Sequence, residues 1–285
     1  MLTAVLLSVL TAVIFGLNVY TQRAALADTD PDTGALLSVT GMAVFFWLGA
    51  PLFVEPEWFF SPVVGLFVLL GLVWPAMGQT LQVASVQKVG PALTMSIGSI
   101  TPLVAIALAM VLVNEPITLP LAIGVLTMVA GLVVAAWGPK HGARPFAVWM
   151  LLLPAGAALA RGLAQPLSKL GMETINSPYF VTLIAGTVST MVLVALRLFH
   201  KRPRKQGKRG TRLFLISGVV NGVGIFFLNS ALALGQVGVV ASIVATAPLW
   251  TLLFGVLWFK QEKLTIRHLV VAVLVFSGSV LVIGR

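Results

Sequence analysis

The sequence of 285 residues contains no cysteine, three histidines and eight acidic residues. Without cysteine the chain has neither disulfide bonds nor thiolate metal sites, and its histidines all fall in polar connecting segments, so we expect no metal site. Charged residues form only 9% of the chain, whereas a soluble domain carries about 25%. Since 59% of the residues are hydrophobic, the few charges cannot cover a water-exposed surface, and the composition predicts an integral membrane protein.

Groups that carry chemistry are also missing from the apolar part of the sequence. The acidic residues all lie in connecting segments or at predicted helix ends. The apolar stretches hold no Ser/His/Asp set, no histidine cluster and no glycine-rich phosphate loop with its lysine. We therefore predict that the protein is not an enzyme, has no catalytic residues and takes no cofactor. The same lack disfavours a proton-coupled exporter of cationic drugs, which usually relies on a carboxylate inside the membrane.

Long apolar runs, by contrast, fill most of the chain. A run of about 20 apolar residues crosses a bilayer as a helix, and ten such runs predict an all-α membrane protein with ten transmembrane helices. The first run has no basic segment before it and no clear cleavage site, which indicates a retained helix rather than a signal peptide. The runs cover residues 3–22, 34–54, 62–86, 90–113, 119–138, 147–168, 179–199, 212–234, 238–259 and 265–284.

Residues 82–118 resemble residues 229–265 of the same chain. In each copy a polar residue closes one apolar helix, a turn with glycine follows, and the next apolar helix has a proline in its first half and ends in Glu-x-x-Thr. Self-similarity at half the chain length indicates a duplicated unit. We predict five-helix repeats at residues 1–138 and 147–285, joined by a connector at residues 139–146. Further matching positions are Gly16 with Gly162, Arg23 with Lys169, and Gly131 with Gly278.

An odd number of helices in each repeat gives the two copies opposite orientations in the membrane. Such inverted repeats are common in secondary transporters, whose substrate site lies between the halves near the midplane. Positive residues mark the cytoplasmic side. With the loops numbered along the chain, fifteen cations fall in odd loops and two in even loops or termini. The charge count therefore predicts odd loops in the cytoplasm and both termini outside.

The net charge of +10 comes largely from residues 197–212, which hold eight of the eighteen cations between two apolar runs. A basic segment in this position is typical of a cytoplasmic loop. We therefore expect the lipid bilayer as a partner of the chain, and no nucleic acid.

The two copies share a glycine at the turn, a proline in the following helix and the closing Glu-x-x-Thr. These positions are Gly90-Pro91, Pro102, Glu115 and Thr118 in the first copy, and Gly238, Pro248, Glu262 and Thr265 in the second. With these features the whole chain resembles the EamA-type permeases of the drug/metabolite transporter superfamily. The resemblance implies transport of an amino acid, another small metabolite, a sugar or a drug through a central cavity lined by the first, third, fourth, sixth, eighth and ninth helices. It also implies a bacterial inner (cell) membrane and, in many members, cytoplasmic termini, opposite to the orientation that the charge count favours.

Arg161 is the one charged residue well inside an apolar run, at residues 151–167. Its burial is costly unless the guanidinium meets water, carbonyl groups or a counter-charge. A membrane arginine that faces a cavity suits the carboxylate of a substrate. Alternatively, Arg161 bonds backbone carbonyls near Pro166 or extends towards the membrane interface.

Buried amides and two tryptophans complete the predicted substrate site. Lipid cannot satisfy an amide, so these side chains should face the protein interior, where they either line the cavity or join helices by hydrogen bonds. A tryptophan beside a proline inside a helix either forms the wall of an apolar pocket or simply packs. The predicted substrate-binding residues are Asn18, Trp74, Gln79, Gln82, Arg161, Gln165, Asn221, Asn229 and Trp250, with hinges at Pro102 and Pro248.

The sequence thus predicts a secondary transporter, a permease or exporter, that works by alternating access. Its substrate would be a small metabolite, such as an amino acid or another carboxylate. The alternatives are a multidrug exporter of neutral or aromatic compounds, and a membrane scaffold or lipid-handling protein that transports nothing. Since ten helices can enclose a cavity alone, we expect a monomer. Glu115 and Glu262 are expected to cap the helices that follow them.

Overall fold

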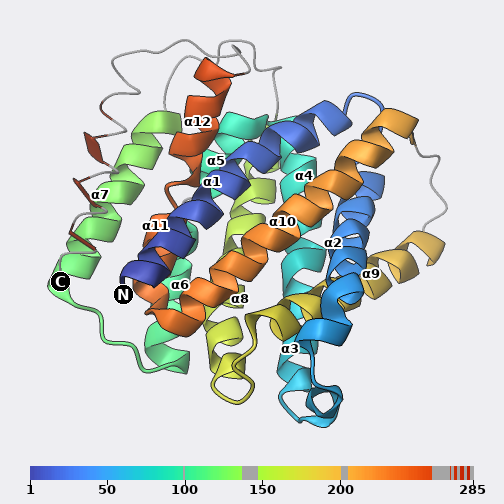
Figure 1. Ribbon diagram of the computed structural model, residues 1–285. Helices are drawn as coiled ribbons and strands as arrows, with labels where there is room; N and C mark the ends of the chain where they lie inside the picture. The colour runs from blue at the N-terminus through green and yellow to red at the C-terminus, as the bar shows by residue number, and fades with distance from the viewer. Residues whose placement is uncertain are drawn as a thin grey trace.

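The computed structural model describes residues 1–98, 100–136, 147–199 and 205–258, together with residues 270, 273, 274, 277, 278, 281 and 282. Every regular element of these residues is a helix, and the helices form one bundle (Figure 1). Thr29 and Gln206 add an isolated β-bridge between two connecting loops. The predicted all-α fold is therefore confirmed over the described residues.

Seven helical segments of the described chain are long and apolar enough to cross a membrane. Helix α5 (Pro91–Gly98) and the apolar helices α6 (Thr101–Leu112) and α7 (Leu119–Ala136) are shorter. The predicted tenth run, residues 265–284, falls mostly outside the described residues, so ten spans remain a prediction. The seven segments are α1 (Leu2–Ala25), α2 (Pro31–Phe53), α3 (Val64–Gly71) with η2 (Leu72–Met77) and α4 (Gly78–Lys88), η3 (Val148–Leu151) with α8 (Leu152–Met172), α9 (Pro178–Phe199), α10 (Lys208–Leu234), and α11 (Val237–Val244) with α12 (Ala247–Leu257); a short helix η1 (Pro56–Phe60) precedes α3.

The bends predicted at Pro102 and Pro248 lie just before these prolines. The run at residues 90–113 forms two helices, α5 and α6, and Pro102 is in the first turn of α6. In the same way, α11 ends at Val244 and Pro248 is in the first turn of α12. Proline is tolerated in a first turn because its missing N–H has no helical partner there. Both copies of the repeat therefore break their apolar run at the same place.

A third irregular point lies between α3 and α4. Here η2 is a π-helical turn in which Trp74 has φ −147° and ψ 123°, values outside the helical region. Pro75 follows and has no N–H to donate to the preceding turn. Trp74 is buried, so the irregular backbone is covered by protein. Backbone of this kind is found at membrane depth only where protein or a cavity surrounds it.

Glycines allow the helices of the two copies to approach closely. A side-chain Cβ at Gly218 of α10 would lie 2.0 Å from the carbonyl oxygen of Ser38 in α2. A Cβ at Gly16 of α1 would lie 2.8 Å from Trp250 Cβ in α12, and one at Gly162 of α8 would lie 2.6 Å from Val104 Cβ in α6. Small residues are what bring membrane helices together. The matching positions Gly16 and Gly162 thus make matching contacts, each with the helix that follows a break.

The first helices of the two copies end at opposite ends of α10 (Figure 1). After α1, the N–H of Asp30 donates to Lys205 O (2.9 Å) and the N–H of Gly207 donates to Asp28 O (2.9 Å), next to the start of α10. Near the end of α8, Lys169 Nζ donates to Gly235 O (2.6 Å), just past the end of α10. The contacts after α1 also place the loop at residues 27–30, with Asp28 and Asp30, against residues 205–207, which precede α10.

Candidate functional site

Arg161 lies on α8 in the middle of the bundle, and the residue is only 8% exposed. Its Nη2 donates a hydrogen bond to Gln82 Oε1 on α4. The guanidinium also lies over two aromatic rings, 4.7 Å from the centre of the Trp74 ring and 5.5 Å from the centre of the Phe15 ring. Aromatic faces attract cations at these distances, most strongly where water is excluded. The cation is therefore held by a neutral amide and two rings.

Three polar side chains share one face of α8. Gln165 and Ser168 follow Arg161 at spacings of four and seven residues, which places them on the same side of a helix. All three line a pocket whose empty volume, counting the part open to the surroundings, is about 340 Å³. The pocket is lined by Leu70, Trp74, Pro75, Arg161, Ala164, Gln165, Ser168, Ala185, Ile225, Leu228 and Asn229. It combines a polar face from α8 with an apolar wall from α3, η2 and α10.

A second pocket adjoins Arg161 at the two helix breaks. Its empty volume, measured in the same way, is about 270 Å³. The lining includes the last residues before each break and the first ones after it. These residues are Met95, Gly98, Thr101, Arg161, Ala241, Val244, Ala245, Ala247 and Pro248. Because Arg161 lines both pockets, any rearrangement at the breaks changes the space around the guanidinium.

Several buried polar atoms around Arg161 have no hydrogen-bond partner within the described chain. They are Nε of Arg161, Nε1 of Trp74, and both amide atoms of Gln165. A buried polar group without a partner costs about 1–3 kcal/mol. The pocket therefore presents donors and an acceptor that a polar ligand can satisfy.

The structure brings together about half of the predicted substrate-site residues. Trp74, Arg161, Gln165 and Asn229 line the first pocket, and Gln82 binds Arg161. The Nδ2 of Asn229 also donates to Thr182 Oγ1 (3.1 Å), so this amide joins α10 to α9 as well. Pro248 lines the second pocket. Gln82 itself lines neither of these two pockets, and neither do the predicted residues Asn18, Gln79, Asn221, Trp250 and the hinge Pro102.

Trp250 and Gln79 both lie inside the bundle but line neither of these two pockets. Trp250 lies against Gly16 of α1, where its Cβ occupies the space that the glycine leaves open. Gln79 is fully buried on α4, and both of its amide atoms lack a hydrogen-bond partner within the described chain.

Sequence reasoning missed Ser168 and the apolar wall made by Leu70, Ile225 and Leu228. Helical spacing from Arg161 is the signal that would have indicated Ser168. No comparable signal exists for the apolar wall, because leucine and isoleucine occur throughout the apolar runs. The contact between Arg161 and Gln82 joins residues 79 positions apart, and no local pattern predicts it.

Comparison with known proteins decides the family. The sequence profile described as the EamA-like transporter family matches residues 2–137 and again residues 148–284. The chain belongs to the EamA-like transporter family. It is therefore an integral membrane protein and a transporter of the drug/metabolite transporter superfamily. Members of this EamA-like family are transporters rather than enzymes.

Solved structures agree with the fold of this EamA-like transporter. One structure, titled "Crystal structure of protein", has a TM-score of 0.75 at 14% sequence identity, and the match covers 98% of this chain and 97% of the other. At this identity the likeness shows the fold alone. No curated protein matches the chain.

Proposed function

We propose that the protein is a secondary transporter for a small metabolite that carries a carboxylate, such as an amino acid or another organic acid with an apolar body. The observation that supports this proposal is that Arg161, a cation, is buried in a pocket lined by both copies of the repeat. Its side-chain contacts are a neutral amide and two aromatic rings. The seven acidic residues that the structure describes all lie at helix ends or in connecting segments, so the positive charge is available to a substrate.

The chemistry of a guanidinium suits a carboxylate. Arginine presents N–H donors in a planar fork that matches the two oxygens, and such charge-assisted bonds are about twice as strong as neutral ones. The Nη2 of Arg161 is engaged by Gln82, whereas its Nε has no partner within the described chain. The amide of Gln165 and the hydroxyl of Ser168 lie on the same helix face. They can bind further polar atoms of the substrate.

The rest of the pocket favours an apolar body on the substrate. Trp74, Leu70, Ile225 and Leu228 form the wall opposite the polar face of α8. Binding sites for small molecules commonly combine an apolar lining with a few polar groups that fix orientation. A carboxylate bound at Arg161 would extend its hydrocarbon part against the indole of Trp74.

We further propose ten transmembrane helices in two inverted repeats that work by alternating access. This is supported by α1 and α8, the matching first helices, which end at opposite ends of α10. It is also supported by the matching breaks before Pro102 and Pro248, where both copies can bend. The protein would act as a monomer in a bacterial inner membrane. The end of α10 that begins at Lys208 would face the cytoplasm, since basic residues gather there.

An exporter of neutral aromatic compounds is the second candidate. The rings of Trp74 and Phe15 near the guanidinium of Arg161 favour it. In that case the rings would bind the cargo, and Arg161 would hold them in place.

Counterflow into proteoliposomes separates the two candidates. Vesicles loaded with unlabelled aromatic carboxylates, such as indole-3-acetate or phenylalanine, should accumulate the labelled compound from outside. We expect Arg161→Ala to slow this exchange of acids about tenfold or more at sub-saturating concentrations. The binding of a neutral analogue, such as indole-3-acetamide, should be the same in Arg161→Ala as in the wild type. Exchange of acids at the wild-type rate by Arg161→Ala would reject the carboxylate proposal and favour the neutral substrate.

A further inference from the structure

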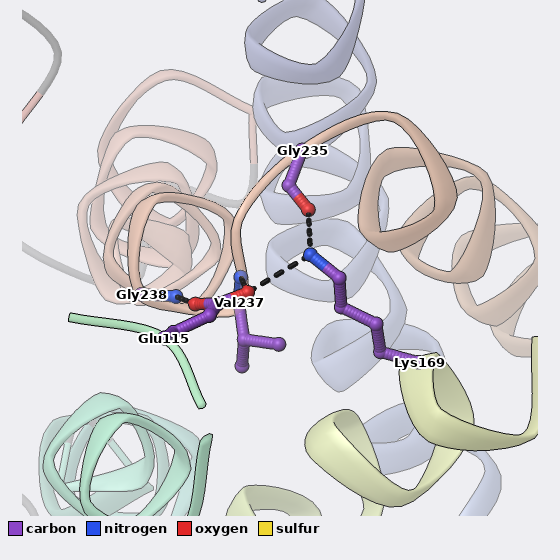
Figure 2. Close-up of polar contacts among 5 residues, drawn as sticks. All are labelled: Glu115, Lys169, Gly235, Val237 and Gly238. Carbon is purple, nitrogen blue, oxygen red and sulfur yellow. Dashed lines mark hydrogen bonds and ion pairs between the residues drawn. The ribbon is translucent and has the colours of Figure 1, made fainter. Parts of the chain in front are cut away.

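Glu115 and Lys169 connect three segments near the ends of α8 and α10, as the contacts in Figure 2 show. Lys169 Nζ lies 2.8 Å from Glu115 Oε1 and also donates to Gly235 O (2.6 Å). The N–H of Val237 donates to Glu115 Oε1 (2.8 Å), and the N–H of Gly238 lies 3.3 Å from Oε2. These contacts join the α6–α7 connection, α8 and the α10–α11 connection.

The carboxylate acts as a cap, but for a helix of the other repeat. The sequence predicts that Glu115 caps the helix that follows it, yet the carboxylate accepts hydrogen bonds from the first N–H groups of α11. The residue before α11, Gln236, gives it no side-chain cap. A negative charge at a helix N-terminus satisfies N–H groups that have no helical partner and is favoured by the helix dipole. The first copy thus supplies the cap that the second copy lacks.

This cluster lies at one end of the elements that line the two pockets. Lys169 follows directly after Ser168, which lines the first pocket, and α11 carries Ala241 and Val244 of the second pocket. A path that leaves the pockets between α8 and α11 would have to separate these helices from each other and from the α6–α7 connection. Glu115 and Lys169 hold these three segments together.

We propose that Glu115 and Lys169 form a latch that keeps this end of the transport pathway closed, and that the latch opens in each transport cycle. The side chains of Lys169 and Glu115 are 21% and 13% exposed, so their charges are partly shielded from water in the closed state. Water can solvate both charges once the segments part, so the latch can open and close reversibly. The proposal rests on these contacts and on the proposed function, in which the two pockets lie on the transport pathway, but it holds whatever the substrate is.

The absence of cysteine makes a direct test simple, because one introduced thiol reports from one place. Ala164→Cys puts the thiol in the first pocket, and a membrane-impermeant methanethiosulfonate reagent applied to one face of proteoliposomes measures its access from that face. We expect Glu115→Gln and Lys169→Gln each to raise the labelling rate from the latch end by about fivefold or more, the effect of a modest coupling energy. The matched control Glu57→Gln removes an exposed carboxylate outside the latch and should leave the rate unchanged.

Two outcomes would overturn the proposal. One is an unchanged labelling rate in both variants. The other is a lower melting temperature with an unchanged ratio of labelling from the two faces, which would make Glu115 a structural cap only.

A covalent cross-link across the latch provides the second measurement. In Glu115→Cys/Lys169→Cys/Ala164→Cys, a short reducible cross-linker between the first two thiols should block labelling of the third from the latch end, and reduction should restore it. Labelling that persists after cross-linking would also reject the latch. Because these measurements need no substrate, they stand or fall separately from the carboxylate proposal.

Discussion

At the scale of single residues, the site depends on one cation and the groups that position it. Arg161 is held by Gln82 from α4 and by the rings of Trp74 and Phe15. None of these neutral groups compensates the positive charge of the guanidinium.

We expect Arg161→Ala to weaken the binding of carboxylates about 10- to 100-fold, since hydrogen bonds to charged groups contribute roughly 1.5–3 kcal/mol. Arg161→Lys should bind with intermediate affinity, because it keeps the charge and loses the planar fork. Equilibrium binding of a labelled acid to the purified variants measures the difference.

Gln82→Glu tests the same site without removing the arginine. The change is nearly isosteric and places a carboxylate at the atom that accepts the hydrogen bond from Arg161 Nη2. An internal counter-charge would compete with the carboxylate of the substrate. We expect the affinity for acids to fall by about tenfold or more, while the melting temperature stays the same or rises. An affinity for acids equal to that of the wild type would show that the substrate does not contact the guanidinium.

Gly218 sets the distance between α2 and α10. Since a Cβ at this position would lie 2.0 Å from Ser38 O, Gly218→Ala must push the two helices apart. We expect a loss of stability of about 1–3 kcal/mol, as for other overpacked sites, seen as a lower melting temperature in detergent. Gly65→Ala is the matched control, because no atom lies within 4 Å of its added Cβ. Equal melting temperatures for the two variants would contradict the close packing described for α2 and α10.

At the scale of helices, the breaks before Pro102 and Pro248 divide two apolar runs into shorter helices around Arg161. Pro248→Ala restores an N–H that can donate to Val244 O, and α11 and α12 can then join into one helix. We expect a lower rate of transport with little change in affinity, because the variant stiffens the bend without altering the polar lining of the pocket. Pro120→Ala, at another helix start, should transport at the wild-type rate. Counterflow rates together with binding isotherms check this prediction. An unchanged transport rate for Pro248→Ala would show that the break before Pro248 is not a hinge.

The helices were far easier to predict from the sequence than their partners. Apolar runs and prolines indicated the long helices and the two bends, because these depend on local chemistry. The sequence also indicated Arg161 as a candidate substrate-binding residue, since a charge inside an apolar run is unusual. The contact of Glu115 with α11 was not predicted, because a carboxylate at a helix end fits the next helix in sequence as well as one 122 residues away. Long-range choices of this kind depend on how the two copies pack, which local patterns do not specify.

At the scale of the whole molecule, the two ends of the bundle differ in charge. The loop between α1 and α2 meets Lys205 and the basic start of α10 at one end, and Glu115 and Lys169 meet at the other. If the repeats are inverted and the basic end is cytoplasmic, Lys205→Cys should react with an impermeant thiol reagent only from inside intact cells or vesicles. Glu57→Cys, in the short helix η1, should react only from outside. Labelling of both thiols from the same face would contradict the predicted topology, and labelling on exchanged faces would reverse the orientation.

The central claim is that the buried guanidinium of Arg161 binds the carboxylate of a transported substrate. The most direct test is thermal stabilisation of the purified protein by pairs of compounds that differ only in charge, such as indole-3-acetate and indole-3-acetamide. A ligand that binds the folded protein raises its melting temperature by mass action. We predict that the acid stabilises the wild type more than the amide does, and that this difference disappears in both Arg161→Ala and Gln82→Glu. Equal stabilisation by acid and amide in the wild type, or a preference for the acid that survives in Arg161→Ala, would contradict the account.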